Sequence, residues 1–290
     1  KTGIILLFMA ADLFLPFDLL PTPLFSVVSR GNLPPPSRFF SGAIPAATLV
    51  IMRPSGNGGP DEILMVKRAS NMAFAAGAVV FPGGRVDPDD HLVAERYGFG
   101  EDPAEGAARV AALRETLEET GLGVGLPNLA EPDLADVRRA LLGGTLLSDI
   151  LAAHGAPIHL GGLVPFARWC PNFKEARTFD TRFYAVAAPP HGHELTVEEA
   201  EHSHIFWSSA RDTLTLADRG EVSVIFPTRR NLERIAQADD FAGFARHAEN
   251  YPVELVTPWI EERDGTPHLC IPGHLGYPVT SEAFEQVRRG

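Results

Sequence analysis

The sequence predicts a mixed α/β sandwich, in which strands and helices are layered around one core. Segments rich in β-branched and apolar residues, typical of strands, occur on both sides of one long helical segment at residues 103–120. The chain has 290 residues, of which 45% are hydrophobic, so it can bury a complete core. Strands and helices that alternate in this way pack in layers around one core.

Residues 1–40 are expected to be a poorly ordered leader. An apolar run at residues 3–11 is soon interrupted by acidic residues and prolines, so it is shorter than the roughly 20 residues that cross a bilayer. A secretory signal has an apolar run of this length, but little positive charge precedes it and no clear cleavage site follows. A membrane span is therefore not expected, and an export signal is the less favoured alternative.

The folded part is expected to begin near Gly42 with a β-hairpin. Residues 43–53 and 62–68 have the composition of buried strands, and the segment between them is rich in glycine and proline. Residues 76–81 predict another short strand, which the turn Pro82-Gly83-Gly84 is expected to end.

The segment 103–120 predicts a helix at both of its ends. Pro103 suits the first turn, and Gly121 suits the position just after the last turn. Val110, Leu113 and Leu117 recur at helical spacing and give the helix a stripe that faces the core.

The rest of the chain predicts further helices and strands. In order, these are helices at 133–142 and 146–153, strands at 163–169, 181–188 and 204–207, a helix at 226–246, and a hairpin of residues 253–260 and 267–271 that turns at Asp264-Gly265. We expect residues 41–225 to form the main domain and residues 226–290 a C-terminal extension. The extension either packs on the same domain or contacts a second subunit, so a homodimer is left open.

The charge and the cysteines exclude several classes of protein. A net charge of −12 disfavours a nucleic-acid-binding protein, because a phosphate backbone is bound by clustered lysines and arginines. Cys170 and Cys270 have no zinc-site spacing and are expected to be buried, reduced thiols of a cytoplasmic protein. The histidines at 191, 193, 202 and 204 lack helical metal-site spacing and partner cysteines, so a transition-metal site is disfavoured.

The helix at 103–120 carries the residues that indicate chemistry. Glu115, Glu118 and Glu119 are spaced so that three carboxylates share one face of the helix. An acidic face is often only solvated surface, but here a glycine turn in the preceding segment lets the backbone approach a metal or a phosphate closely. Clustered carboxylates suit Mg²⁺ or Mn²⁺, and the adjacent Arg114 can hold one of the carboxylates through a bidentate contact.

With these residues the sequence resembles the Nudix hydrolase family. Residues 114–122 match the core of the family signature, with Thr116 where an aliphatic residue is usual. The resemblance implies a Nudix-like α/β/α sandwich with a mixed sheet and a Mg²⁺- or Mn²⁺-dependent hydrolase that cleaves a nucleoside diphosphate linkage. It makes Glu118 and Glu119 metal ligands, Glu115 a ligand or base, Arg114 the residue that orients Glu115, and Gly83 a backbone-carbonyl ligand.

Two departures from the family pattern leave one position open. The segment between Gly84 and Arg114 is about sixteen residues longer than in the family, so residues 87–102 are expected to bulge out as a loop. The family's upstream glutamate has no single counterpart. Counting forward from Gly84 gives Asp90, and counting back from Arg114 gives Gly106, with Glu105 beside it.

The enlarged loop resembles the coenzyme A diphosphatase branch of the family. Similar segments include Lys67-Arg68, residues 177–183 and residues 226–232, so coenzyme A or an acyl-coenzyme A is the expected substrate. ADP-ribose or a dinucleotide is the alternative substrate. The alternative of another class is a regulatory module that binds a nucleotide without catalysis.

Further residues are candidates for contacts with the substrate or the metal. Arg68 is expected to bind a phosphate or to be a solvated arginine at the end of a strand. The candidates for an additional acidic ligand or base are Glu198, Glu199 and Glu201, although a solvated acidic turn is favoured for each one. Trp169, Phe173 and Phe179 either stack on a base or pack in the core, and core packing is favoured.

Overall fold

The computed structural model describes residues 42–69, 77–98, 102–127, 129–171, 178–189, 195 and 202–287. The expected leader at residues 1–40 lies outside this part of the chain. The strands are β1 (Ile44–Arg53), β2 (Glu62–Arg68), β3 (Val79–Val80), β4 (Gly83–Arg85), β5 (Val164–Trp169), β6 (Phe179–Ala187), β7 (His202–Ser209), β8 (Leu255–Val256), β9 (Trp259–Arg263), β10 (Thr266–Cys270) and β11 (Ser281–Ala283). The helices are α1 (Pro88–Arg96), α2 (Pro103–Thr120), α3 (Glu131–Leu142), α4 (Leu147–His154), α5 (Ala210–Asp218), α6 (Phe226–Ile235), α7 (Phe241–Glu249) and α8 (Phe284–Val287).

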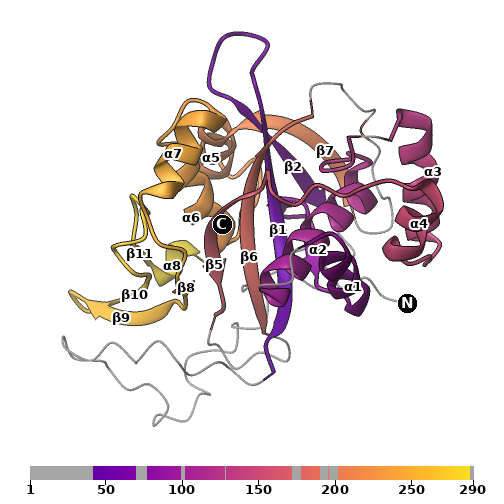
Figure 1. Cartoon of the computed structure of the whole chain (residues 1–290). Coiled ribbons are helices and arrows are strands. Elements are labelled where there is room, and N and C mark those ends of the chain that lie inside the picture. Colours follow the sequence, from indigo (N-terminus) through magenta and orange to yellow (C-terminus); the bar gives the residue numbers. More distant parts are fainter. Residues whose placement is uncertain are drawn as a thin grey trace.

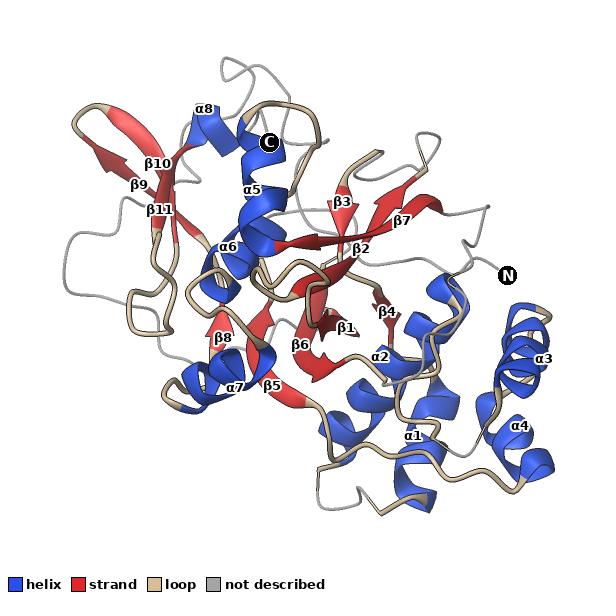
Figure 2. Cartoon of the chain, turned by 90° about the horizontal axis from the view of Figure 1, so that it is seen from above, coloured by secondary structure: helices blue, strands red, loops and turns tan. Residues whose placement is uncertain are grey.

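A mixed sheet divides the molecule into two layers of helices, as the sequence predicts. Its main path runs β3-β2-β1-β6-β5-β8, with β4 paired to β1 and β7 paired to β2. The central pair β1 and β6 is parallel, whereas β2 and β4 pair with β1 in antiparallel orientation. Helices α1 to α4 lie on one side of this sheet, and α5 to α7 with the small sheet β9–β11 lie on the other (Figures 1 and 2).

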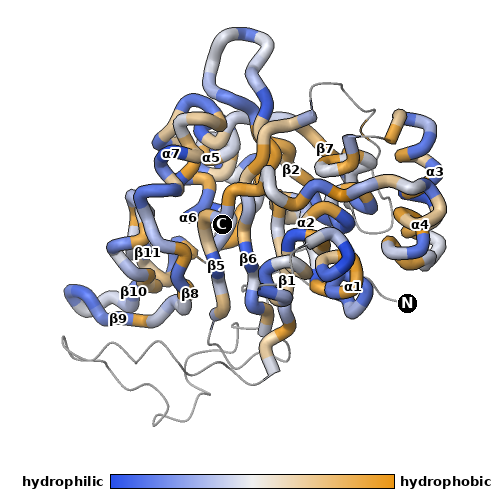
Figure 3. Tube along the Cα trace, viewed as in Figure 1, coloured by the Kyte–Doolittle hydropathy of each residue, from blue (hydrophilic) through white to orange (hydrophobic). Residues whose placement is uncertain are grey.

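Strand β1 is buried on both faces and separates two hydrophobic clusters. Ala47, Leu49 and Ile51 belong to the cluster on the side of α1 to α4. Val50 and Met52 belong to the cluster on the side of α5 to α7. Successive side chains of a strand point to opposite faces, so this near-continuous apolar run serves both layers. The hydrophobic segments accordingly lie along the central strands (Figure 3).

The helix predicted at 103–120 is correct at both ends. The side chain of Asp102 accepts a hydrogen bond from the backbone N–H of Glu105 and caps the start of α2. Gly121 has the left-handed φ of 77° and ends the helix. No helix of the described residues is both long enough and apolar enough to span a bilayer.

The single helix predicted at 226–246 is wrong, because this segment forms two helices. Helix α6 ends at Ile235 and α7 begins at Phe241. The side chain of Asp240 accepts a hydrogen bond from the backbone N–H of Gly243, so a new N-terminus forms inside the predicted span. Leu232 and Ile235 on α6 and Phe244 on α7 are all buried.

The C-terminal hairpin is confirmed in part. Strands β9 and β10 pair as expected, and Asp264 and Gly265, with φ of 51° and 76°, form the turn. Strand β11 extends the pair to three strands. The first part of the predicted strand 253–260 instead becomes β8, which joins the main sheet parallel to β5.

A buried hydrogen-bond network joins the C-terminal segment to the main sheet. The indole Nε1 of Trp169 on β5 donates to the hydroxyl of Tyr277 at 2.9 Å. That hydroxyl donates to Oδ1 of Asn231 on α6 at 3.1 Å. The hydroxyl of Tyr277 therefore links β5, α6 and the C-terminal segment by hydrogen bonds.

We expect Tyr277→Phe to lower the free energy of unfolding by about 1–3 kcal/mol, because it leaves a buried indole donor and a buried amide oxygen without their partner. Equilibrium denaturation in urea measures this change. An unchanged free energy of unfolding would contradict a stabilising role for the network.

Candidate active site

The glycine segment before the candidate catalytic helix is a strand, which corrects the turn predicted from the sequence. Gly83–Arg85 forms β4 and pairs with residues 46–48 of β1. A Cβ atom at Gly83 would lie 2.4 Å from the carbonyl oxygen of Ala47 and 2.7 Å from Cα of Thr48. The lack of a side chain therefore lets β4 lie flush against β1 instead of only turning the chain.

Helix α2 packs against this strand with its acidic residues. We call Glu115, Glu118 and Glu119 the acidic ridge. The backbone N–H of Gly83 donates to Oε2 of Glu119 at 3.1 Å. A Cβ atom at Gly84 would lie 2.1 Å from the carboxyl carbon of Glu115, so this carboxyl group fills the space that a side chain at position 84 would need. Glu115 and Glu119 are buried, and Glu118 is partly exposed.

Arg114 connects the acidic ridge to the inserted segment. Its Nε and Nη2 donate to the two carboxylate oxygens of Asp90, each at 2.9 Å, in a bidentate contact. Its Nη1 donates to Oε1 of Glu115 at 3.0 Å and to Oε1 of Glu118 at 3.2 Å. Nη2 also donates to the carbonyl oxygen of Arg85 on β4 at 3.0 Å. One guanidinium thus holds two glutamates of the ridge, the strand β4 and Asp90.

The structure decides between the two positions that the sequence left open for the upstream acid. Asp90 is fully buried and is the bidentate partner of Arg114. Glu105 instead pairs with Arg109 and Arg182 near the other end of α2.

The loop predicted at 87–102 is wrong over most of its length. Residues 88–96 form helix α1, with Pro88 in its first turn, and the carboxylate of Asp90 accepts a hydrogen bond from the backbone N–H of Asp87. The run Asp87-Pro88 is a signal for the start of a helix, and it could have indicated α1 from the sequence.

Burial disfavours the charged forms of the carboxyl groups in the ridge. Burial raises the pKa of Glu115 to about 8, although the charge of Arg114 opposes the shift. Burial also raises the pKa of Glu118, again against the effect of Arg114. Burial alone would lower the pKa of Arg114, but the charges of Glu115 and Asp90 raise it, so this arginine stays charged.

The donor chemistry of the ridge fits a hard divalent cation. Its side chains offer carboxylate oxygens, which Mg²⁺ and Mn²⁺ prefer, and a single guanidinium faces the three carboxyl groups of Glu115, Glu118 and Asp90. In the part of the chain described here, no group of three or more His, Cys, Asp or Glu side chains is arranged as a ready-made metal site. Arg114 Nη1 binds Glu115 and Glu118, so these carboxylates are engaged by the guanidinium.

The other candidate residues have different outcomes. Arg68 is only 1% exposed, so its interpretation as a solvated strand-end arginine is wrong, while a phosphate contact stays a prediction. Trp169 packs in the core, as expected, with edge-to-face contacts to Phe226 and Tyr277. Phe179 is also buried. The candidates Glu198, Glu199 and Glu201 and the aromatic residue Phe173 lie outside the described residues.

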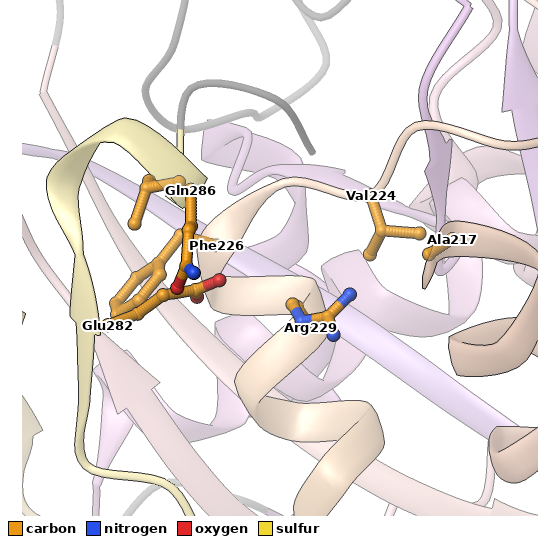
Figure 4. Close-up of a pocket in the computed structure, with 7 residues that line it drawn as sticks. Ala217, Val224, Phe226, Arg229, Glu282 and Gln286 are labelled. Atoms are coloured by element: carbon orange, nitrogen blue, oxygen red, sulfur yellow. The ribbon is translucent and has the colours of Figure 1, made fainter. Parts of the chain in front are cut away.

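A small pocket lies on the side of the sheet opposite α2 and contains none of the candidate site residues. It has a volume of about 120 Å³ and lies beside the start of α6 (Figure 4). Its lining residues are Ala217, Val224, Phe226, Arg229, Glu282, Gln286 and Val287. Its charged side chains are paired, since Arg229 contacts Asp218 and Glu282 contacts Arg230.

Comparison with known proteins identifies relatives of this chain. A family model described as NUDIX domain matches residues 43–138, which include β4 and the acidic ridge. The crystal structure of a NUDIX hydrolase from Alicyclobacillus acidocaldarius is 33% identical, with a TM-score of 0.62, over 70% of this chain and 96% of that chain. A Caenorhabditis elegans protein named as a nudix hydrolase is 23% identical over 184 residues, which are 62% of this chain and 57% of that protein. The chain thus spans a little more than half the length of the worm protein.

Proposed function

The chain belongs to the Nudix hydrolase family, and we propose that it hydrolyses the pyrophosphate bond of its substrate at the acidic ridge on α2. The observation that carries this proposal is the clamped arrangement of the ridge. Arg114 holds Glu115 and Glu118, and Gly83 donates to Glu119, so the carboxylates gather against the two glycines of β4. An acidic helix face that was only solvated surface would not be fixed in this way.

We assign a separate role to each residue of the ridge. Glu118 and Glu119 would hold a divalent cation, Mg²⁺ or Mn²⁺, with the carbonyl of Gly83 as a further ligand. Glu115 acts as a ligand or as the base that accepts a proton from water, and Arg114 fixes its Oε1. When bound, the cation would offset the negative charge of the diphosphate oxygens and lower the pKa of a water bound to it. Arg68 is assigned to a phosphate of the substrate.

The proposed substrate is coenzyme A or an acyl-coenzyme A. Support comes from the enlarged segment between Gly84 and Arg114, which folds as α1, and from the segments around Arg68 and residues 226–232 that resemble the coenzyme A diphosphatases. A cytoplasmic location and a small-molecule substrate, without nucleic acid or membrane, belong to the same proposal. A homodimer also stays a prediction.

We expect Mg²⁺- or Mn²⁺-dependent hydrolysis of coenzyme A, with phosphopantetheine and adenosine bisphosphate as products. The measurement is product analysis over coenzyme A, an acyl-coenzyme A, ADP-ribose, NADH and nucleoside triphosphates, each with and without the metal. Chelation of the metal should abolish turnover, because the acidic ridge without a cation repels the negative charge of a diphosphate.

The panel also separates the alternatives. Hydrolysis of ADP-ribose or NADH in preference to coenzyme A would replace the proposed substrate and keep the site. If no compound is hydrolysed with either metal, the site assignment fails and a binding module without catalysis takes its place.

A further inference from the structure

Helix α1 is held at both ends by helix α4 and by Ala156, which follows it. At the first turn of α1, the carboxylate of Asp89 accepts hydrogen bonds from the backbone N–H of Ser148 at 3.0 Å and from its hydroxyl at 2.5 Å. Just after α1, the hydroxyl of Tyr97 donates to the carbonyl oxygen of Ala156 at 3.0 Å. The two contacts join opposite ends of α1 to opposite ends of α4, so α4 fixes both the position and the direction of α1.

The residue next to Asp89 holds the catalytic arginine. Asp90 is fully buried and binds Arg114 through both carboxylate oxygens, and Arg114 in turn binds Glu115 and Glu118. An arginine side chain has many rotamers, so its place depends on the group that its fork binds. Any shift of α1 therefore moves Asp90 and changes where Nη1 of Arg114 meets Glu115 and Glu118.

Helix α1 has only nine residues, and a helix of this length is marginal without tertiary contacts. Asp89 is itself buried, with 8% of its surface exposed, so its carboxylate contacts α4 and is shielded from solvent.

We propose that Asp89 is a positioning residue for hydrolysis: it fixes α1 on α4, and through Asp90 it sets the place of the Arg114 guanidinium. This inference rests on the proposed function, because it concerns the same site. It adds that α4, which lies outside the sequence motif, forms part of the support of the catalytic arginine.

The test compares two aspartates that each bind the N-terminus of a helix. Asp89 accepts from the N–H of Ser148 on α4, and Asp240 accepts from the N–H of Gly243 on α7, across the sheet from α2. We expect Asp89→Ala to lower kcat by about 10-fold with KM within about two-fold, because small displacements of catalytic groups cost rate more than binding. Asp240→Ala should keep kcat within about two-fold of the parent. Asp89→Asn, which keeps one acceptor oxygen, should recover most of the lost rate.

A second variant and a second readout keep the inference testable if Asp89→Ala does not fold. Tyr97→Phe removes only the hydroxyl contact with Ala156 and, like Asp89→Ala, should lower kcat. Hydrogen exchange at Nε of Arg114, followed by NMR of ¹⁵N-labelled protein and assigned with Arg114→Lys, needs no substrate. We expect exchange to be at least about ten-fold faster in the Asp89 and Tyr97 variants than in the parent and in Asp240→Ala.

The outcomes separate this inference from the proposed function. If the folded Asp89 and Tyr97 variants keep the parental kcat and the parental exchange at Arg114, then α4 does not position the arginine, even though the enzyme is active. An equal loss of kcat in Asp240→Ala would overturn the inference as well, because the effect would then be one of general stability. If the parent hydrolyses nothing, the proposed function fails, while faster exchange at Arg114 in the Asp89 variant would still support the mechanical link.

Discussion

Glu118→Gln is expected to lower Mg²⁺-dependent turnover by at least about 10²-fold while the protein stays folded. Glutamine has the same shape and can still accept a hydrogen bond from Nη1 of Arg114, but it removes the charge that a cation needs. Burial raises the pKa of Glu118, which shows that its charged form is unfavourable in the metal-free protein. The melting temperature without metal should therefore stay the same or rise.

Metal binding can be followed in this variant without any substrate. A cation that binds only the folded chain raises its melting temperature, and this rise should be much smaller in Glu118→Gln than in the parent. Glu249→Gln is the matched control, because Glu249 is an exposed glutamate on α7, across the sheet from the ridge. Parental turnover together with a parental metal-induced rise in Glu118→Gln would remove Glu118 from the site.

Gly84→Ala is expected to abolish most of the activity without unfolding the protein. The added methyl group would lie 2.1–2.5 Å from the three atoms of the Glu115 carboxyl group, so this flexible side chain must leave its place. Turnover should fall by at least about 10²-fold, because the carboxyl group loses its position beside Arg114 and β4. Steady-state kinetics and a thermal melt of the same sample measure both effects.

The neighbouring glycine provides the contrast. In Gly83→Ala the methyl group meets the backbone of Ala47 and Thr48, which cannot move aside, so we expect a loss of about 1–3 kcal/mol in the free energy of unfolding. Gly273→Ala is the control, because a Cβ atom there would meet nothing within 4 Å. Full activity of Gly84→Ala, or parental stability of Gly83→Ala, would show that β4 does not lie against the ridge and β1 as described.

Some parts of the fold could be predicted because their signals are local. Helix α2 has Pro103 in its first turn, Gly121 after its last turn and a three-residue apolar stripe between them, so its bounds follow from local signals and periodicity. Strand β2 is likewise bounded by a glycine- and proline-rich turn. The turn predicted at Gly83 failed for the opposite reason. Gly83 looks like a turn by composition, and only its pairing with β1 makes it a strand.

The family signature, the shared helix face of Glu115, Glu118 and Glu119, and the layered α/β class can be read from the chain alone, because spacing along a helix and alternation along a strand are local properties. Tertiary packing was needed to show that Asp90 and not Glu105 holds Arg114, and that α1 is fastened to α4. These contacts join residues 24 and 59 positions apart, and no local pattern encodes which side chains meet over such distances. That choice depends on how the layers pack around the sheet.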